Sequence, residues 1–382
     1  MALARALVAT PSVNPTLAPG GAGESAAAEL CEGWLRGWGF QVERLEAEED
    51  RPSIVGRLPA GSDGSRLLLN GHLDTVGIEG MERPPFEAVV EDGLLYGRGA
   101  CDMKGGVAAL LSAAHALATG PAEDRPGLVV ALTADEEHAS VGMDALVRSG
   151  VEADAAVVCE PTSLAVMPAH KGFVWVEAVF RGRAAHGSRP DRGVDAIRHA
   201  GLYLAALDRY ETRLREGARH ELLGPGSHHA GTIRGGTAES VYPDRCTLLL
   251  ERRTLPGETP AAVLAEFQEV LDEVKEGHPE MDTELRVTLD RPGTEVATSS
   301  RVVEGLLAAA DRQGVTTGVE GMSAWVDAAF LNESGIPAVC FGPGDIAQAH
   351  AAVEWCPVDE IRACGRVLEE LARGWSRSSP VS

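Results

Sequence analysis

Short apolar segments alternate with segments of helical periodicity through the first half of the chain. Apolar runs over 66–70 (RLLLN), 128–133 and 155–159 predict strands, and the first is apolar enough to be buried on both faces. Residues 24–38 and 104–119 carry Ala and Leu at helical spacing, which predicts two helices. Strands and helices in alternation predict an α/β sheet with helices on both faces.

The pattern changes near residue 172. Residues 173–181 (FVWVEAVFR) alternate with a period close to two, as a half-exposed antiparallel strand does. Two further strands are expected over 245–253 and 283–289, with helices over 194–207 and 260–275. Two helices on one antiparallel sheet make a small α+β unit of about 100–120 residues, an ordinary domain size.

Helical patterns of the first kind return later in the chain, over 300–312 and 357–374. We therefore predict one α/β domain made of residues 1–171 and 291–382, with residues 172–290 inserted as an α+β domain. A chain of 382 residues is too long for one compact core, which supports this division.

The chain is strongly acidic. Its 34 Lys and Arg against 57 Asp and Glu give a formal net charge of −23. This balance argues against nucleic acid and against an anionic membrane surface as partners, because both are bound through clustered basic residues. In addition, no apolar run approaches the roughly 20 residues of a membrane span.

Cysteine usage and the first residues indicate the compartment. The seven cysteines are odd in number, widely spread and without a CxxC pair, which predicts reduced thiols. Residues 1–10 lack the basic region, the apolar stretch and the cleavage site of a signal peptide. We expect a soluble, cytoplasmic protein.

His72 and Asp74 directly follow the apolar run over 66–70. Residues two apart in an extended chain point the same way, so the two side chains can be neighbours. An Asp beside a metal-binding His is a common arrangement that fixes the tautomer and orientation of the ring. A polar surface turn explains the same two residues about as well.

Asp102 lies in a glycine-dense turn, residues 97–106 (GRGACDMKGG), just before a predicted helix. The turn matches neither GxxxxGK[ST] nor a GxGxxG segment followed by a ribose-binding acid, so a phosphate cradle is disfavoured. Asp102 is then either a metal ligand held in a rigid turn or the cap of the helix.

Glu136 and Glu137 end a run of three carboxylates behind the strand over 128–133. Neighbouring carboxylates raise one another's pKa, and a bound dication relieves their repulsion, after which one of them can act as a general base. For this segment alone a solvated acidic loop is the favoured reading, because the chain has 57 acids.

Further candidates follow two other strands. Glu160 comes directly after the strand over 155–159, and His350 comes after an apolar run over 338–341. Ligands of open α/β sheets bind at the carboxyl ends of strands, so such residues at several strand ends predict a metal centre there. Nitrogen and oxygen donors without sulfur suit zinc, cobalt or manganese better than calcium or magnesium.

Seven motifs of this chain occur together in a known family. The chain resembles the zinc amidohydrolase family of acetylornithine deacetylase, succinyl-diaminopimelate desuccinylase, aminoacylase and glutamate carboxypeptidase, from about Ala6 to the last predicted helix. The resemblance implies a two-metal, aminopeptidase-like catalytic domain with an inserted ferredoxin-like domain that dimerises and acts as a lid. The motifs are GHLDTV, GRGACDMKGG, TADEE, CEPTSL, AAHGSRPDRGVDAI, ERRTLPGE and FGPGDIAQAH.

The same resemblance implies two divalent metal ions. Zinc is the expected metal, with cobalt or manganese as alternatives. Asp102 would bridge the two ions. His72 and Glu160 would complete the first ligand set, and Glu137 and His350 the second.

It also implies the residues that act on the substrate's amide bond. Asp74 would orient His72, and Glu136 would take a proton from water and pass it to the leaving amine. His186 of AAHGSRP would reach the partner subunit's site and stabilise the tetrahedral oxyanion, a task that needs a donor at the developing charge. This role requires a homodimer. Gly187 follows His186 where a Ser is common in the family, which predicts a looser loop.

Substrate binding is implied for a second group of residues. Arg253 of ERRTLPGE would grip the substrate's α-carboxylate with its planar fork, whereas Arg252 would face the other side of the strand and be solvated. Gly235 and Gly236 resemble the family's substrate-side glycine loop. Ser240 stands where the family usually has Asn, and this shorter side chain bears on the choice of substrate.

The implied activity is hydrolysis of small N-acyl-L-amino acids, most like acetylornithine deacetylase, an enzyme of arginine biosynthesis. Succinyl-diaminopimelate desuccinylase is the runner-up, because GLLYGRGACDMKGG fits it equally well. A carboxypeptidase or dipeptidase of the family is a further alternative, although the aminopeptidase and dipeptidase branch usually carries Asp where this chain has Glu160. An inactive metal-binding protein would not need Glu136, and a dimeric scaffold leaves the strand-end acids unexplained.

Overall fold

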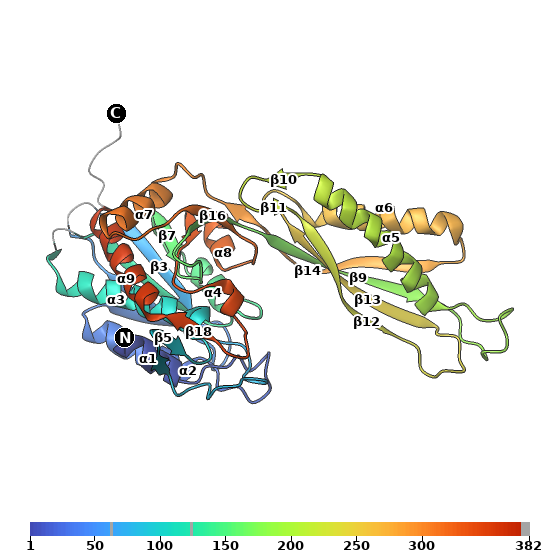
Figure 1. The fold of residues 1–382 in the computed structure, drawn as a ribbon, viewed down its shortest axis with the longest axis horizontal. Helices are drawn as coiled ribbons and strands as arrows, with labels where there is room; N and C mark the ends of the chain where they lie inside the picture. The colour runs from blue at the N-terminus through green and yellow to red at the C-terminus, as the bar shows by residue number, and fades with distance from the viewer. Residues whose placement is uncertain (62–63, 123–124, 376–382) are drawn as a thin grey trace. The chain divides into compact units, whose positions relative to one another are not determined.

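The structure, a computed structural model, describes residues 1–61, 64–122 and 125–375. The chain divides into two compact units. Unit 1 contains Met1–Pro168, Val296–Glu320 and the residues from Val326 on, and unit 2 contains Ala169–Glu295 and Gly321–Trp325. Unit 1 is therefore built from both ends of the chain and unit 2 from its middle (Figure 1).

Unit 1 is organised around a mixed sheet whose strand order is β1-β2-β6-β3-β7-β17-β8. The four neighbours β6, β3, β7 and β17 run parallel, and the outer strands pair antiparallel. The predicted strand RLLLN is buried from Leu67 on. The strands are β1 (Gln41–Glu46), β2 (Pro52–Leu58), β3 (Arg66–His72), β6 (Gly127–Thr133), β7 (Ala155–Val158), β8 (Val166–His170) and β17 (Ala338–Cys340).

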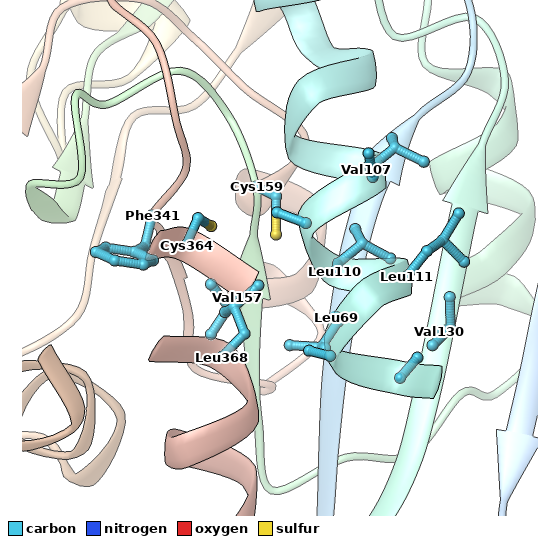
Figure 2. Packing of buried hydrophobic residues seen from close by; sticks show 14 of the residues in the cluster. Leu69, Val107, Leu110, Leu111, Val130, Val157, Cys159, Phe341, Cys364 and Leu368 are labelled. Carbon is cyan, nitrogen blue, oxygen red and sulfur yellow. The ribbon is translucent and has the colours of Figure 1, made fainter. Parts of the chain in front are cut away.

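Helices cover both faces of this sheet. On one face five helices share a single apolar core with alternate residues of the strands, such as Leu67 and Leu69 of β3, while Leu68 points away from it. Figure 2 shows part of this core between α3, α9 and the central strands. Helices α4 and α8 contact each other and supply no residue to it. The five helices are α1 (Ala2–Ala9), α2 (Ser25–Gly37), α3 (Gly105–Thr119), α7 (Arg301–Arg312) and α9 (Val358–Arg373), and the other two are α4 (Val141–Arg148) and α8 (Ala328–Glu333).

The predicted α/β class is thereby confirmed. The sequence pattern does not predict α1, β1 or a small second sheet of order β18-β5-β4. This sheet places the segment after residue 350 beside the glycine-dense turn, because β18 pairs with β5. Its strands are β4 (Val89–Glu91), β5 (Leu94–Tyr96) and β18 (Trp355–Pro357). The turn Ala100–Lys104 contacts β18, and the turn Ile346–Gln348 in turn contacts Ala100–Lys104. A further short strand, β16 (Val319–Met322), pairs with β8 of the large sheet.

Helix α3 packs closely on the end of β7 at Gly106. A Cβ atom added at Gly106 would lie 2.0 Å from the backbone oxygen of Cys159. We expect Gly106→Ala to lower the free energy of unfolding by about 1–3 kcal/mol, because neither backbone can move without disturbing the core. Gly33→Ala in α2 is the matched control: a Cβ atom there meets nothing within 4 Å. It should stabilise unit 1 by about 0.5–1 kcal/mol. Denaturant unfolding measures both, and equal stability of the two variants would contradict the expectation.

Unit 2 is an antiparallel sheet of order β12-β13-β9-β14 with two helices on one face (Figure 1). Alternate residues of β9 and β13, including Phe180 and Leu248, form a core with Tyr203 and Phe267 of the helices. This is the small α+β unit that the sequence predicts. Its elements are β9 (Gly172–Arg181), α5 (Ala196–Glu216), β10 (Arg219–His220), β11 (Gly224–Pro225), β12 (Ser227–Gly235), β13 (Arg245–Thr254), α6 (Pro260–Gly277), β14 (Asp282–Arg291) and β15 (Thr294–Glu295).

Two features of unit 2 differ from the sequence pattern. Strand β12 is unexpected because all of its residues except His228 are exposed, so it carries no hydrophobic alternation. Helix α5 continues past residue 207 to Glu216, since Tyr210 and Leu214 still pack on the core although the residues around them are charged. A strand or helix end with little buried surface leaves no periodic signal.

The state of the cysteines and the length of the apolar helices can be compared with the sequence predictions. All seven cysteines are buried and free, as expected for reduced thiols. Among the described residues, no helix combines the length and the apolar character needed to cross a membrane.

Candidate metal centre

The carboxyl ends of four parallel strands place the candidate residues at one edge of the unit 1 sheet. His72 is the last residue of β3, and Glu137 lies four residues beyond β6. Glu160 follows β7, and His350 follows β17 after a loop. Because β6, β3, β7 and β17 are adjacent and parallel, their following loops meet at the same edge.

Asp102 lies between two groups of potential ligands. Its Oδ1 atom is 3.0 Å from Nε2 of His72, and its Oδ2 atom is 3.5 Å from Nε2 of His350. The latter nitrogen is also 2.9 Å from Oε2 of Glu137. The ligand atoms of His72, Asp102 and Glu160 lie within 4.8 Å of one another, and so do those of Asp102, Glu137 and His350. The two carboxylate oxygens of Asp102 therefore face different groups.

Two buried carboxylate oxygens at this edge are suited to binding a cation. Oε1 of Glu137 and Oε1 of Glu160 are buried and have no hydrogen-bond partner among the described residues. A buried acceptor without a partner costs about 1–3 kcal/mol, and more when charged, so a cation would stabilise both. Imidazole nitrogens and carboxylate oxygens without sulfur are a donor set of zinc, cobalt or manganese. The residues present thus fit a pair of divalent cations.

The carboxylates of the centre repel one another. Burial, together with the charge of Glu160, raises the pKa of Glu136 well above its usual value. Burial and the charge of Asp102 raise the pKa of Glu160 in the same way and that of Glu137 to about 7. Burial also raises the pKa of Asp327, a neighbour that the sequence pattern does not single out, to about 7. Divalent cations would offset this crowding of negative charge.

The two histidines are held by the same carboxylates. Burial alone would lower the pKa of His72, but hydrogen bonds with Asp102 and Asp74 raise it well above its usual value. Hydrogen bonds with Asp102 and Glu137 raise the pKa of His350 to about 10. A metal ion would displace these protons, because imidazole binds metals in its neutral form.

Asp74 lies beside His72 and also supports the acidic loop. Nδ1 of His72 is 3.0 Å from the backbone oxygen of Asp74 and 3.5 Å from its Oδ1 atom. The Asp74 carboxylate accepts hydrogen bonds from the backbone N–H of Glu136 at 3.1 Å and of Glu137 at 3.2 Å. Asp74 thus contacts three of the candidate residues.

A buried polar network beneath Asp74 has no counterpart in the sequence pattern. Nδ2 of Asn14 donates to Asp74 at 2.8 Å and to Asp135 at 2.9 Å. Arg51 donates to Asp135 at 2.7 Å and binds Glu24 with two further hydrogen bonds. Asp135, the first carboxylate of the acidic run, is therefore buried in an ion pair with Arg51 and is not part of a solvated loop. Only the chain's long-range folding brings these partners together, so no local signal could have found them.

His186 lies in unit 2, in a loop that pairs with the segment around Ser240. The N–H of Gly187 donates to the Ser240 oxygen at 2.7 Å, and His186 forms a β-bridge with Val241. The N–H of Ser188 donates to Nδ1 of His186 at 3.2 Å. A backbone N–H can only donate, so Nδ1 is the acceptor and the proton of the neutral ring sits on Nε2. His186 is exposed and presents a donor.

Arg253 and Arg252 lie on opposite faces of β13, but the expectation that Arg252 is solvated is wrong. Arg252 is 1% exposed, and its side chain bonds Tyr210 at 3.1 Å and Glu258 at 2.8 Å. The alternation of β13 places it on the face that the helices cover. Arg253 is on the other face, half-buried, with its Nε donating to Glu251 at 2.6 Å.

The expected glycine loop lies in the same unit. Gly235 ends the edge strand β12, and Gly236 has a φ of +79°, a conformation that favours glycine. Ser240 is exposed a few residues later. Their contact with a substrate stays a prediction.

An α/β sheet that gathers His, Asp and Glu at its carboxyl edge, with one carboxylate facing two ligand groups, is the architecture of a metallohydrolase. The family model described as "Peptidase family M20/M25/M40" matches residues 68–374. The chain belongs to this family, and it is a metallohydrolase that acts on amide bonds. The resemblance seen in the sequence motifs is thereby confirmed.

Similar proteins cover nearly the whole chain. An acetylornithine deacetylase of Myxococcus xanthus is 34% identical over 348 residues, 89% of each protein. An acetylornithine deacetylase of Pectobacterium carotovorum is 30% identical over 379 residues, 97% of this chain and 96% of the relative.

Solved structures share the fold. A tripeptidase of Staphylococcus aureus has a TM-score of 0.81 at 20% identity and covers 99% of this chain and 98% of its own. A dinuclear metal-binding M20 peptidase of Bacillus subtilis has a TM-score of 0.75 at 18% identity, and the match covers 97% of this chain and 96% of that protein.

Proposed function

We propose that this protein is an N-acyl-L-amino-acid amidohydrolase that releases acetate from N-acetylornithine. The chemistry rests on Asp102, whose two oxygens face two separate ligand groups. The choice of substrate is supported by the two bacterial acetylornithine deacetylases that resemble nearly the whole chain. Succinyl-diaminopimelate desuccinylase and a carboxypeptidase or dipeptidase remain the alternatives.

Two divalent cations, zinc in the first place and cobalt or manganese otherwise, would be held by these groups. His72, Asp102 and Glu160 would hold one ion, and Asp102, Glu137 and His350 the other. The Bacillus subtilis neighbour, which is described as dinuclear, supports a pair. When bound, such ions lower the pKa of a water molecule and polarise the amide carbonyl.

Glu136 would move the proton. Its carboxylate would accept a proton from the attacking water and deliver it to the nitrogen of the leaving amine. The backbone N–H of Glu136 is bound by Asp74, which limits the positions of its side chain. Burial raises the pKa of the Glu136 carboxyl well above its usual value, which makes the carboxylate a stronger base.

His186 would stabilise the oxyanion through the proton on Nε2. The orientation follows from the hydrogen bond that Ser188 donates to Nδ1. We propose that this happens in the partner subunit of a homodimer. Arg253 would bind the substrate's α-carboxylate, and Gly235, Gly236 and Ser240 would line the substrate. We place the enzyme in the cytoplasm, which the seven free, buried thiols support. A role in arginine biosynthesis follows from the proposed substrate and is supported by the acetylornithine deacetylases that resemble the chain.

The test of the activity is amine release from a substrate panel. Metal-loaded protein should act faster on N-acetylornithine than on N-succinyl-diaminopimelate or a dipeptide, and a chelator should abolish turnover until zinc returns. Faster release from the succinyl substrate would replace the proposal with the runner-up. Metal analysis at saturation should find two ions per chain, and a maximum of one ion would contradict the two-metal site.

The dimer is expected to form through the exposed edge strand β12. Ile233 on this strand is 50% exposed, and an unpaired, partly apolar edge is a template for pairing with another chain. Ile233→Lys should produce monomers in sedimentation and lower turnover, because His186 then lacks a partner site. Val90→Lys, at a similarly exposed apolar residue of unit 1, is the matched control and should change neither. A fully active monomer would contradict the dimer and the role of His186 together.

A further inference from the structure

Glu354 occupies a position that the sequence motifs do not account for. It is 1% exposed, and its carboxylate accepts hydrogen bonds from the backbone N–H groups of Gly99, Cys101 and Asp102 at 3.0, 2.9 and 3.2 Å. Nη1 of Arg98, also buried, donates to it at 2.7 Å. One side chain therefore satisfies four donors of the glycine-dense turn.

The turn needs such an acceptor because its backbone is irregular. Gly99 has a φ of +79°, and Asp102 and Met103 have non-helical backbone angles. Backbone N–H groups in a buried, irregular segment have no regular partner, and each one left unpaired costs free energy. Since one of the bonded groups is the N–H of Asp102 itself, Glu354 restrains the residue whose carboxylate faces both ligand groups.

Glu354 also belongs to the segment that carries His350. The backbone oxygen of Glu354 accepts from Gly97 at 3.2 Å, and Nη1 of Arg98 reaches the oxygen of Ala351 at 3.4 Å. His350 itself is 52% exposed and has a φ of +61°, so its own packing restrains it little. The separation between His350 and Asp102 thus depends on how these two segments are joined.

We propose that Glu354 and Arg98 form a clamp that positions Asp102 and His350 for the second metal ion. The inference rests on the proposed two-metal function. Neither residue is among the proposed metal ligands, so both are positioning residues. Stability alone is a weak reason for the pair, because the desolvation of two buried charges offsets much of their attraction. The hydrogen bonds of Glu354 to the turn, in contrast, fix the backbone of Asp102 and so the position of its carboxylate.

The test is the zinc affinity of Glu354→Gln, measured from the metal-free protein by competition with a chromophoric chelator. Glutamine keeps the size of the side chain, but its NH₂ group replaces one of the two acceptor oxygens. That group cannot accept a hydrogen bond, so some of the N–H donors of the turn lose their acceptor. The more weakly bound zinc should lose about 10–100-fold in affinity, the usual effect of removing a group that orients a ligand. Arg98→Lys, which keeps the positive charge, should lose less zinc affinity than Arg98→Met.

Leu306→Ala is the matched control for stability. Leu306 is fully buried in α7, within the apolar core of unit 1. The variant should lower the unfolding midpoint of the metal-free protein and leave zinc affinity unchanged. Glu354→Gln binding both zinc ions as tightly as the parent would overturn the clamp, and so would an equal loss of affinity in Leu306→Ala.

The zinc titration keeps this inference separate from the choice of substrate. A parent that binds two zinc ions but leaves N-acetylornithine intact would refute the proposed substrate, while the comparison of affinities would still support the clamp. A parent that binds a single zinc ion would overturn the clamp as stated, since there would be no second ion to position.

Discussion

Glu136→Gln is expected to lower turnover by about 10²–10⁴-fold, the usual contribution of a general base, while both metal ions stay bound. Glutamine preserves the shape of the side chain but cannot accept the proton. Glu136 is in neither ligand group, and the hydrogen bond that fixes it to Asp74 comes from its backbone. The substitution should therefore leave the loop in place.

The measurement is kcat at saturating substrate together with the metal content of the same sample. Glu333→Gln, at the exposed end of α8, is the control and should behave like the parent. Near-parental turnover of Glu136→Gln with two ions bound would show that another group moves the proton. Loss of the ions would instead mean that Glu136 supports the ligand set.

Much of the candidate site could be predicted because parallel strands carry it. Buried parallel strands appear in the sequence as continuous apolar runs. The His, Asp and Glu residues that follow such runs are easy to recognise because they are polar and come directly after apolar residues. His72, Glu160 and His350 each come directly or shortly after such a run. The carboxyl ends of neighbouring parallel strands meet at one edge, so residues far apart in sequence could be placed together before any contact was known.

The supporting residues could not be found in this way. Asn14, Arg51 and Glu354 are buried polar residues whose partners lie tens to hundreds of positions away. Neither periodicity nor a motif distinguishes such a residue from a solvated one, because its burial follows from the whole fold. Arg252 differs from its prediction for a related reason: its charge predicts exposure to solvent, but the alternation of β13 and the partner Glu258 place its side chain inside.

Arg253→Ala is expected to lower kcat/KM for N-acetylornithine by about 10²–10⁴-fold. Two charged hydrogen bonds to a carboxylate contribute about 1.5–3 kcal/mol each, and each 1.4 kcal/mol is tenfold in rate. Nε of Arg253 is bound to Glu251, and its guanidinium lies 5.5 Å from the centroid of the Phe173 ring. Within the described residues its two Nη groups make no hydrogen bond, so the fork is available to a ligand.

The substrate's carboxamide separates binding from folding. An amide carries no negative charge, so the parent should be slow on it, and Arg253→Ala should slow it little further. Arg253→Lys should recover only part of the loss on the free acid, because an ammonium group cannot match both oxygens. Arg245→Ala, exposed at the start of the same strand, is the control and should leave both substrates unaffected. Equal losses on the acid and on its amide would mean that Arg253 supports unit 2 or the dimer, and another residue would then have to bind the carboxylate.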